Sequence, residues 1–307
     1  MSNRLTTEIA GLRLTNPTML AAGILGLSAA TLKEAVKQGA GAVVTKSIGL
    51  EPRSGYTNPA VVQLGDYGLL NAMGLPNPGA KNFATELREL KQDGLNAPVI
   101  ASVFGFSENE FAKVARILAK AGADAIELNV SCPHVERTGS EIGQNPRLVL
   151  QVVKKVKSAI RVPVIVKLTP NTADIIEVAM AAARAGADAV VAINTIRAMS
   201  IDIETARPIL GNKTGGLSGR VLKPVAVRCI YEIYEAVNVP VIGCGGVASW
   251  QDAVELMLAG ASAVQIGTAV ASEGLGIFKS VCKGIDAYMH RKGFRSLKEV
   301  VGLSHRR

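Results

Sequence analysis

The stretch Ala121-Gly122-Ala123-Asp124-Ala125-Ile126 joins the end of a helical pattern to the start of an apolar strand pattern. Variants of it recur as Gln38-Gly39-Ala40-Gly41-Ala42-Val43-Val44, Ala185-Gly186-Ala187-Asp188-Ala189-Val190 and Ala259-Gly260-Ala261-Ser262-Ala263-Val264. Glycine ends helices in a left-handed conformation. The apolar runs that follow are typical of parallel strands buried on both faces. The repeat therefore predicts helices that alternate with parallel strands.

Eight such strands can be drawn along the chain, with helical patterns between them. They cover residues 18–22, 42–46, 98–103, 125–130, 163–168, 189–194, 240–244 and 263–267. Eight alternations in 307 residues favour an α/β fold of the closed (β/α)8 TIM-barrel type over an open doubly wound sheet. We expect a single barrel domain over residues 1–307, with a β-hairpin at 5–14 that plugs the barrel bottom.

Two connections are longer than the fold requires, at residues 47–81 and 195–222. Each follows a predicted strand, so each lies at the carboxyl end of the barrel, where the loops of this fold carry function. Polar residues end four of the strands, namely Lys46, Asn129, Lys167 and Asn194-Thr195. A buried lysine is costly unless it meets an anion or polar ligand, although both lysines could instead reach solvent at the rim.

The last two strands end in glycine, at Gly243-Cys244-Gly245-Gly246 and Gly267-Thr268. Barrels of this type often bind phosphate there, because backbone N–H groups can approach its oxygens closely. Ser249 is expected to cap the helix behind Gly245 and Gly246. A phosphate site, two lysines and a cysteine together favour a flavin, with Lys167 as the positive group beside the reduced ring.

The run Ile126-Glu127-Leu128-Asn129-Val130-Ser131-Cys132-Pro133-His134 is a strand that ends in a polar loop carrying a cysteine. We interpret Cys132 as a proton acceptor and residues 131–145 as an active-site lid, which ends at the helix start Asn145-Pro146. The other cysteines, Cys229, Cys244 and Cys282, lie in apolar contexts typical of packing residues. No C-x-x-C pair occurs, so no metal site or iron–sulfur cluster is expected in this chain.

Composition narrows the class of protein further. No uninterrupted apolar run reaches the length of a membrane span, and the first residues carry no apolar signal core, so we expect a cytoplasmic protein. The net charge of +9 is scattered over predicted helix faces. This pattern favours a solvated surface that attracts small anions over a nucleic-acid site.

Several longer motifs occur in a fixed order. They are Thr45-Lys46-Ser47, Asn71-Ala72-Met73-Gly74-Leu75-Pro76-Asn77-Pro78-Gly79, Asn129-Val130-Ser131-Cys132-Pro133, Val166-Lys167-Leu168-Thr169-Pro170-Asn171, Ile193-Asn194-Thr195, Gly215-Gly216-Leu217-Ser218-Gly219, Gly245-Gly246 and Gly267-Thr268. With these motifs the chain resembles the class 1 FMN-dependent dihydroorotate dehydrogenases over nearly its whole length. It is most similar to the catalytic subunit of the NAD-linked, two-subunit class 1B type.

The resemblance implies oxidation of (S)-dihydroorotate to orotate in de novo pyrimidine biosynthesis. Cys132 would be the base at C5 while a hydride passes from C6 to flavin N5. A partner subunit carrying FAD and a 2Fe–2S cluster would pass the electrons to NAD, and two catalytic subunits would form a homodimer within a heterotetramer. A fumarate-using type is the alternative for the electron acceptor. Cys132 and the missing anchor argue against the membrane-bound branch, which usually has serine as the base.

The resemblance also implies which residues hold each ligand. For the substrate these are Lys46, Asn71, Ala72, Met73, Gly74, Leu75, Asn129, Asn194 and Thr195. For FMN they are Ala22, Lys46, Ser47, Ser102, Asn129, Lys167, Ile193, Gly219, Gly245, Gly246, Gly267 and Thr268.

Two positions depart from the family pattern. His134 stands where the family usually has an asparagine that reaches the substrate, and Ser102 stands where an asparagine often touches flavin. His134 could donate a hydrogen bond to the substrate or face water. The alternatives to dihydroorotate are a dihydropyrimidine, as in FMN-linked oxidoreductases of dihydrouracil or dihydrothymine, and a tRNA dihydrouridine. The tRNA enzymes need a further RNA-binding domain after the barrel, and a non-catalytic flavin scaffold is disfavoured by the intact Cys132 loop.

Overall fold

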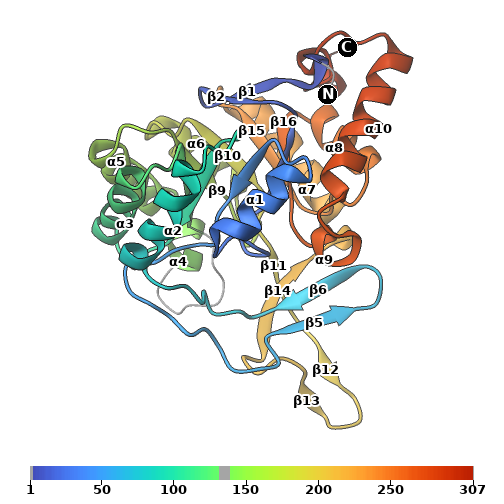
Figure 1. Cartoon of the computed structure of the whole chain (residues 1–307). Helices are drawn as coiled ribbons and strands as arrows, with labels where there is room; N and C mark the ends of the chain where they lie inside the picture. The colour runs from blue at the N-terminus through green and yellow to red at the C-terminus, as the bar shows by residue number, and fades with distance from the viewer. Residues whose placement is uncertain (1–2, 131–138, 307) are drawn as a thin grey trace.

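The computed structural model describes residues 3–130 and 139–306. Its centre is a closed barrel of eight parallel strands, in the order β10-β15-β16-β3-β4-β7-β8-β9 (Figure 1). The strands are β3 (Thr18–Leu20), β4 (Ala42–Val44), β7 (Val99–Val103), β8 (Ala125–Asn129), β9 (Val164–Lys167), β10 (Ala189–Ala192), β15 (Val241–Cys244) and β16 (Ala261–Ile266). Each predicted strand is confirmed, so the (β/α)8 fold is confirmed.

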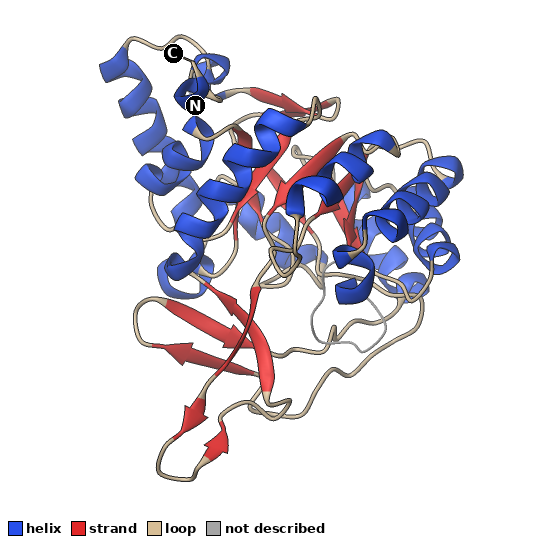
Figure 2. Cartoon of the chain, turned by 180° about the vertical axis from the view of Figure 1, so that it is seen from behind, coloured by secondary structure: helices blue, strands red, loops and turns tan. Residues whose placement is uncertain are grey.

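Helices surround the barrel, as Figure 2 shows from behind. The longer ones are α1 (Ala29–Lys37), α2 (Ala80–Gln92), α3 (Glu108–Lys120), α5 (Pro146–Ala159), α6 (Ile175–Arg184), α7 (Lys223–Ala236), α8 (Trp250–Leu258) and α10 (Ile277–Lys292). Two short helices, α4 (Gly139–Gln144) and α9 (Ala269–Glu273), lie beside them. The predicted helix start at Asn145-Pro146 is confirmed, since the Asn145 side chain accepts hydrogen bonds from the N–H groups of Arg147 and Leu148.

The core has two shells, because successive side chains of a strand point to opposite faces. On β8, Ile126 and Leu128 pack outward among the helices, whereas Ala125 packs inside the barrel. The predicted hairpin is confirmed as β1 (Thr7–Ile9) paired antiparallel with β2 (Leu12–Leu14). Ile9 and Leu14 belong to the inner cluster, so the hairpin closes one end of the barrel.

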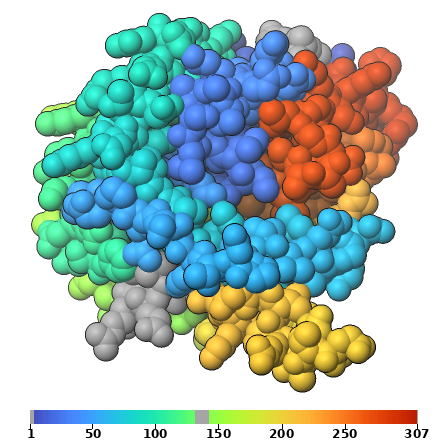
Figure 3. All heavy atoms as spheres, turned by 60° about the horizontal axis from the view of Figure 1, so that its bottom comes forward, coloured from blue at the N-terminus to red at the C-terminus, as the bar shows by residue number. Residues whose placement is uncertain are grey.

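The two long connections fold into a second sheet, which the sequence did not indicate. Its antiparallel order is β11 (Ile196–Met199), β14 (Thr214–Ser218), β6 (Gly68–Asn71) and β5 (Val61–Leu64). A small hairpin, β12 (Ile201–Asp202) with β13 (Arg207–Pro208), extends from it. Figure 1 places this sheet at the end of the barrel opposite the β1–β2 hairpin, and Figure 3 shows both connections side by side on that face.

Two of the predicted packing cysteines behave as expected, since Cys229 and Cys282 are both buried. Across residues 3–130 and 139–306, none of the helices combines the length and the apolar character needed to cross a bilayer.

Gly284 on α10 lets that helix lie directly against Trp250 of α8. A Cβ atom at this position would stand 2.1 Å from Cγ of Trp250, which is far inside any real contact. Gly284→Ala should therefore lower the free energy of unfolding by about 1–3 kcal/mol, the usual cost of overpacking. Thermal unfolding measures this effect. Gly276→Ala is the control, since no described atom lies within 4 Å of its Cβ position, and equal melting temperatures for the two variants would contradict the packing argument.

Candidate active site

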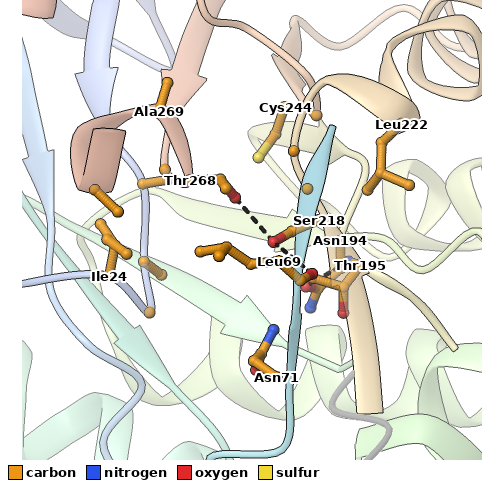
Figure 4. Close-up of a pocket in the computed structure, with 18 of the residues that line it drawn as sticks. Ile24, Leu69, Asn71, Asn194, Thr195, Ser218, Leu222, Cys244, Thr268 and Ala269 are labelled. Carbon is orange, nitrogen blue, oxygen red and sulfur yellow. Dashed lines mark hydrogen bonds between the residues drawn. The ribbon is translucent and has the colours of Figure 1, made fainter. Parts of the chain in front are cut away.

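A cavity of about 410 Å³ opens at the carboxyl ends of the barrel strands, between the barrel and the second sheet. This volume lies within the usual range of small-molecule sites, about 300–1,000 Å³. The close-up in Figure 4 shows Leu69 and Asn71 from β6 on the side of the sheet. Cys244 and Thr268, at the ends of β15 and β16, lie on the side of the barrel. The long connections thus form one wall of the cavity, as their position after the strands suggested.

Most of the residues proposed from the sequence line this one cavity. Of the residues assigned to the cofactor, the cavity lining includes Ala22, Lys46, Ser47, Asn129, Lys167, Ile193, Gly219, Gly245, Gly246, Gly267 and Thr268. Of the residues assigned to the substrate alone, it includes Asn71, Met73, Gly74, Leu75, Asn194 and Thr195.

Four of the proposed residues are not seen in the lining. Ala72 is fully buried behind the wall, in a cluster with Leu70 and Leu210. Ser102 is also fully buried, and its hydroxyl reaches the hydroxyl of Ser47 at 2.9 Å. Ser102 therefore acts on the cavity only through Ser47. Cys132 and His134 lie outside the residues that the structure describes.

A chain of hydrogen bonds orders the amides between two strand ends. Asn129 donates from Nδ2 to Oγ of Ser47 at 2.9 Å, and its Oδ1 accepts from Nδ2 of Asn194 at 3.3 Å. Asn194 in turn accepts at Oδ1 from the backbone N–H of Thr195, at 2.8 Å. Because each amide has both a donor and an acceptor engaged, its orientation is fixed. The wall therefore presents polar groups in a preset arrangement.

Lys167 stands at the floor of the cavity and is 5% exposed. Its Nζ donates to Oε1 of Gln265 at 2.8 Å and lies 4.0 Å from Oε1 of Glu127. Burial alone would lower the pKa of Lys167, but Cys244 and the Glu127 carboxylate outweigh it, so the pKa is raised. The floor of the cavity therefore carries a cation at neutral pH.

Glu127 and Gln265 were missed at the level of sequence. Both occupy inward-facing positions of strands that otherwise read as apolar, and polar residues inside such runs were the signal that could have identified them.

Lys46 is the second cation of the cavity and is partly buried. Burial lowers its pKa, because the charged ammonium loses water. An anionic ligand beside Lys46 would restore a favourable environment for that charge. This part of the cavity therefore favours a negatively charged ligand.

The glycine-rich rim follows β15 and β16. Gly245 and Gly246 have φ values of +126° and +78°, which strongly favour glycine. A Cβ on Gly246 would lie 2.7 Å from the backbone nitrogen of Lys223. Ser249 caps α8 behind them by accepting from the N–H of Asp252, as predicted. On the other side, Thr268 donates to the hydroxyl of Ser218 at 2.9 Å and ties β16 to the second sheet.

Cys244 differs from its expected role as a core residue. It is only partly buried and lines the cavity (Figure 4). Its thiol interacts with the Lys167 ammonium. Burial raises the pKa of its thiol, and Lys167 opposes this effect without cancelling it. Cys244 is therefore a neutral thiol in the cavity wall.

These features fit a phosphate-bearing flavin. The cavity has a cation at its floor, a second cation in its wall and a glycine rim that lets backbone N–H groups approach a ligand. A (β/α)8 barrel with such a pocket at the carboxyl ends of its strands belongs to the class of barrel enzymes that use a bound cofactor.

Comparisons with known proteins identify the family. Residues 4–289 match the family described as "Dihydroorotate dehydrogenase". The chain is similar to the protein named "Dihydroorotate dehydrogenase B (NAD(+)), catalytic subunit" of Methanosarcina mazei, with 55% identity over 97% of this chain and 94% of the relative. The proteins of the same name from Pyrococcus abyssi and Methanothermobacter thermautotrophicus are 51% and 50% identical, over 98% of this chain in both cases and over 99% and 98% of the relatives. The chain belongs to the dihydroorotate dehydrogenase family of oxidoreductases, and this membership implies a bound flavin.

Proposed function

We propose that this chain oxidises (S)-dihydroorotate to orotate in pyrimidine biosynthesis, with FMN as its cofactor. The observation that carries the proposal is the single cavity that gathers two lysines, three asparagines and the glycine rim at the strand ends of a barrel of this family. Residues 1–307 would act as one domain.

FMN, when bound, supplies the hydride acceptor of the reaction. The residues suited to its phosphate are Gly245, Gly246, Gly267 and Thr268, which surround the end of the cavity at β15 and β16. Lys167 is suited to a polar edge of the ring system, because a fixed positive charge there stabilises the reduced, anionic form. The remaining wall, at Ala22, Ser47, Ile193 and Gly219, would enclose the ring.

The substrate has one carboxylate and a ring with amide groups, and the cavity offers partners for both. Lys46 supplies a cation whose environment favours an anion. Asn71, Asn129, Asn194 and Thr195 supply amide and hydroxyl groups, and the loop with Met73, Gly74 and Leu75 lies beside them. Hydrogen bonds that are already in place keep Asn129 and Asn194 oriented, which lowers the cost of ordering them on binding.

Cys132 is proposed as the base that removes the proton from C5. An ordinary thiol has a pKa of about 8.5, so the reaction should speed up toward alkaline pH.

The name "catalytic subunit" of the relatives implies a partner subunit that transfers electrons. We propose that the partner carries FAD and a 2Fe–2S cluster and reduces NAD, and that two copies of this chain form a homodimer within a heterotetramer in the cytoplasm.

Cofactor and substrate can be tested separately. Mass spectrometry of the flavin released by acid from purified protein should find FMN, and FAD in its place would overturn the cofactor assignment. Assays with dihydroorotate and dihydrouracil should show a much higher kcat/KM for dihydroorotate, because dihydrouracil lacks the carboxylate. The opposite preference would assign the chain to dihydropyrimidine oxidation.

Gly216 of β14 allows Thr195 to stand in the substrate wall. A Cβ at Gly216 would lie 2.3 Å from Oγ1 of Thr195, and the carbonyl of Gly216 already accepts from Asn71 at 3.1 Å. Gly216→Ala should displace both polar groups and raise the KM for dihydroorotate about tenfold or more, as the loss of one good hydrogen bond would. Steady-state kinetics checks this effect. FMN content should stay unchanged, and a normal KM would exclude Thr195 and Asn71 from the substrate site.

A further inference from the structure

A buried carboxylate lies just below the floor of the cavity. Glu127 on β8 is 0% exposed, and its side chain shares the inward face of the strand with Ala125. Lys167 and Gln265 line the cavity, whereas Glu127 is outside the described lining. Glu127 therefore has no direct contact with a ligand in this cavity, and its contacts with the lining are made through these two residues.

The contacts of Gln265 connect the carboxylate to the lysine. Its Nε2 donates to Oε2 of Glu127 at 2.6 Å, and its Oε1 accepts from Nζ of Lys167 at 2.8 Å. Because a carboxylate can only accept, Glu127 fixes which end of the amide faces the lysine. The second oxygen of Glu127 has no hydrogen-bond partner within the described part of the chain, and it faces Lys167 at 4.0 Å.

The other groups around Lys167 do not replace this charge. Cys244, from β15, stays a neutral thiol because burial raises its pKa. Lys46, in the loop that follows β4, is a second cation of the same cavity. Asn129, which pairs with Lys167 across β8 and β9, is uncharged. Cys244 and Glu127 are the two described groups that act on Lys167 electrostatically, and Glu127 is the one of the two that is a carboxylate, 4.0 Å from the ammonium.

We propose that Glu127, acting with Gln265, is a positioning residue that holds Lys167 charged and pointed into the cavity, and that it thereby sets the reduction potential of the bound flavin. The flavin part of the inference rests on the proposed function. A buried cation would otherwise tend to lose its proton. The carboxylate keeps the lysine charged. Its own negative charge also reduces the electrostatic stabilisation that the lysine gives to the reduced, anionic ring.

Glu127→Gln tests the proposal because it keeps the shape and the contact with Gln265 but removes the charge. The midpoint potential of the bound flavin is measured from pH 6 to pH 9.5 with a chemical reductant and no dihydroorotate. At the acid end, the midpoint potential of flavin bound to Glu127→Gln should lie above that of the wild type. The variant should prefer reduced over oxidised flavin about tenfold more strongly than the wild type does, which corresponds to about 30 mV for a two-electron couple. As Lys167 loses its proton at higher pH, the potential should fall through an additional pH-dependent step that the wild type lacks.

Asp188→Asn is the matched control. Asp188 pairs with Lys157 at 2.7 Å and accepts from the N–H of Val164, at the opposite end of the barrel. The substitution changes the net charge by the same amount, and the potential profile should match the wild type. A Glu127→Gln profile that also superimposes on the wild type would overturn the positioning role, while a wild-type protein without flavin would overturn the proposed function instead.

Thermal unfolding of the flavin-free protein gives a second readout. Without the carboxylate, burial lowers the pKa of Lys167 and Cys244 alone opposes this effect, so we expect the pKa in the folded state to fall below the unfolded value of about 10.4. The unfolded state then binds more protons between these two pKa values, so the stability of Glu127→Gln rises with pH in that window. The free energy of unfolding of Glu127→Gln should therefore approach that of the wild type as the pH rises toward about 10. A difference in free energy of unfolding that is constant with pH would contradict the coupling between Glu127 and Lys167.

If Glu127→Gln alone does not fold, the double variant Glu127→Gln/Lys167→Met decides the question. A neutral pair of similar size should fold, because buried ion pairs can be replaced by uncharged groups at little cost. Folding of the double variant would support a role of Glu127 through Lys167. Its failure to fold would show that Glu127 acts independently of the lysine and would overturn the proposal.

Discussion

Cys132→Ser should slow the reduction of bound flavin by dihydroorotate about 10²- to 10⁴-fold, the usual loss when a general base is removed. Serine keeps the size of the side chain, but its hydroxyl is a far weaker acid than a thiol at neutral pH and gives up its proton much less readily. Flavin content should stay the same, because Cys132 is not among the residues assigned to FMN. Anaerobic stopped-flow absorbance of the flavin measures the rate directly.

Cys229→Ala is the control for the loss of a thiol, since Cys229 is buried on α7 away from the cavity. It should reduce flavin at the normal rate. A Cys132→Ser variant with unchanged reductive kinetics at every pH would remove the base assignment. The neutral thiol of Cys244, which does line the cavity, would then be the next group to test.

Lys167→Ala should both destabilise the protein and release its flavin. Removal of the lysine leaves the Glu127 carboxylate buried and without its counter-charge, which costs about 3–5 kcal/mol in comparable pairs. It also removes the cation from the cavity floor, so the purified protein should contain less than one flavin per chain. Chemical denaturation and the ratio of flavin to protein absorbance measure the two effects.

Lys157→Ala provides the comparison for an ion pair near the surface. Lys157 contacts Asp188 at 2.7 Å, and its side chain is 33% exposed, so its removal should cost only about 0–1 kcal/mol. A Lys167→Ala variant that is yellow, as stable as Lys157→Ala and normal in its redox behaviour would refute the role of Lys167.

The barrel was predictable because its strands repeat one pattern. Four of the apolar runs follow a glycine-bearing helix end, and the other four alternate with helical patterns in the same way. Closure of the barrel then brings the polar ends of the strands together. Lys46, Asn129, Lys167 and Asn194 line one cavity for this reason.

The second sheet could not be predicted from a sequence pattern in the same way. Strand β14 carries Gly215 and Gly216, which weaken any strand pattern, and its partner β6 is far away in the sequence. The Glu127–Gln265–Lys167 contacts were equally hidden. A strand buried on both faces does not reveal which of its residues point inward until the barrel closes, so a glutamate and a glutamine on different strands could not be paired in advance.

Anaerobic mixing of the purified chain with dihydroorotate tests the central claim most directly, because one signal reports cofactor and substrate together. The account predicts that the visible absorbance of the oxidised flavin bleaches and that about one orotate forms per flavin, without the partner subunit or NAD. A colourless protein that does not take up added FMN, or a yellow protein whose absorbance is unchanged by dihydroorotate, would contradict it.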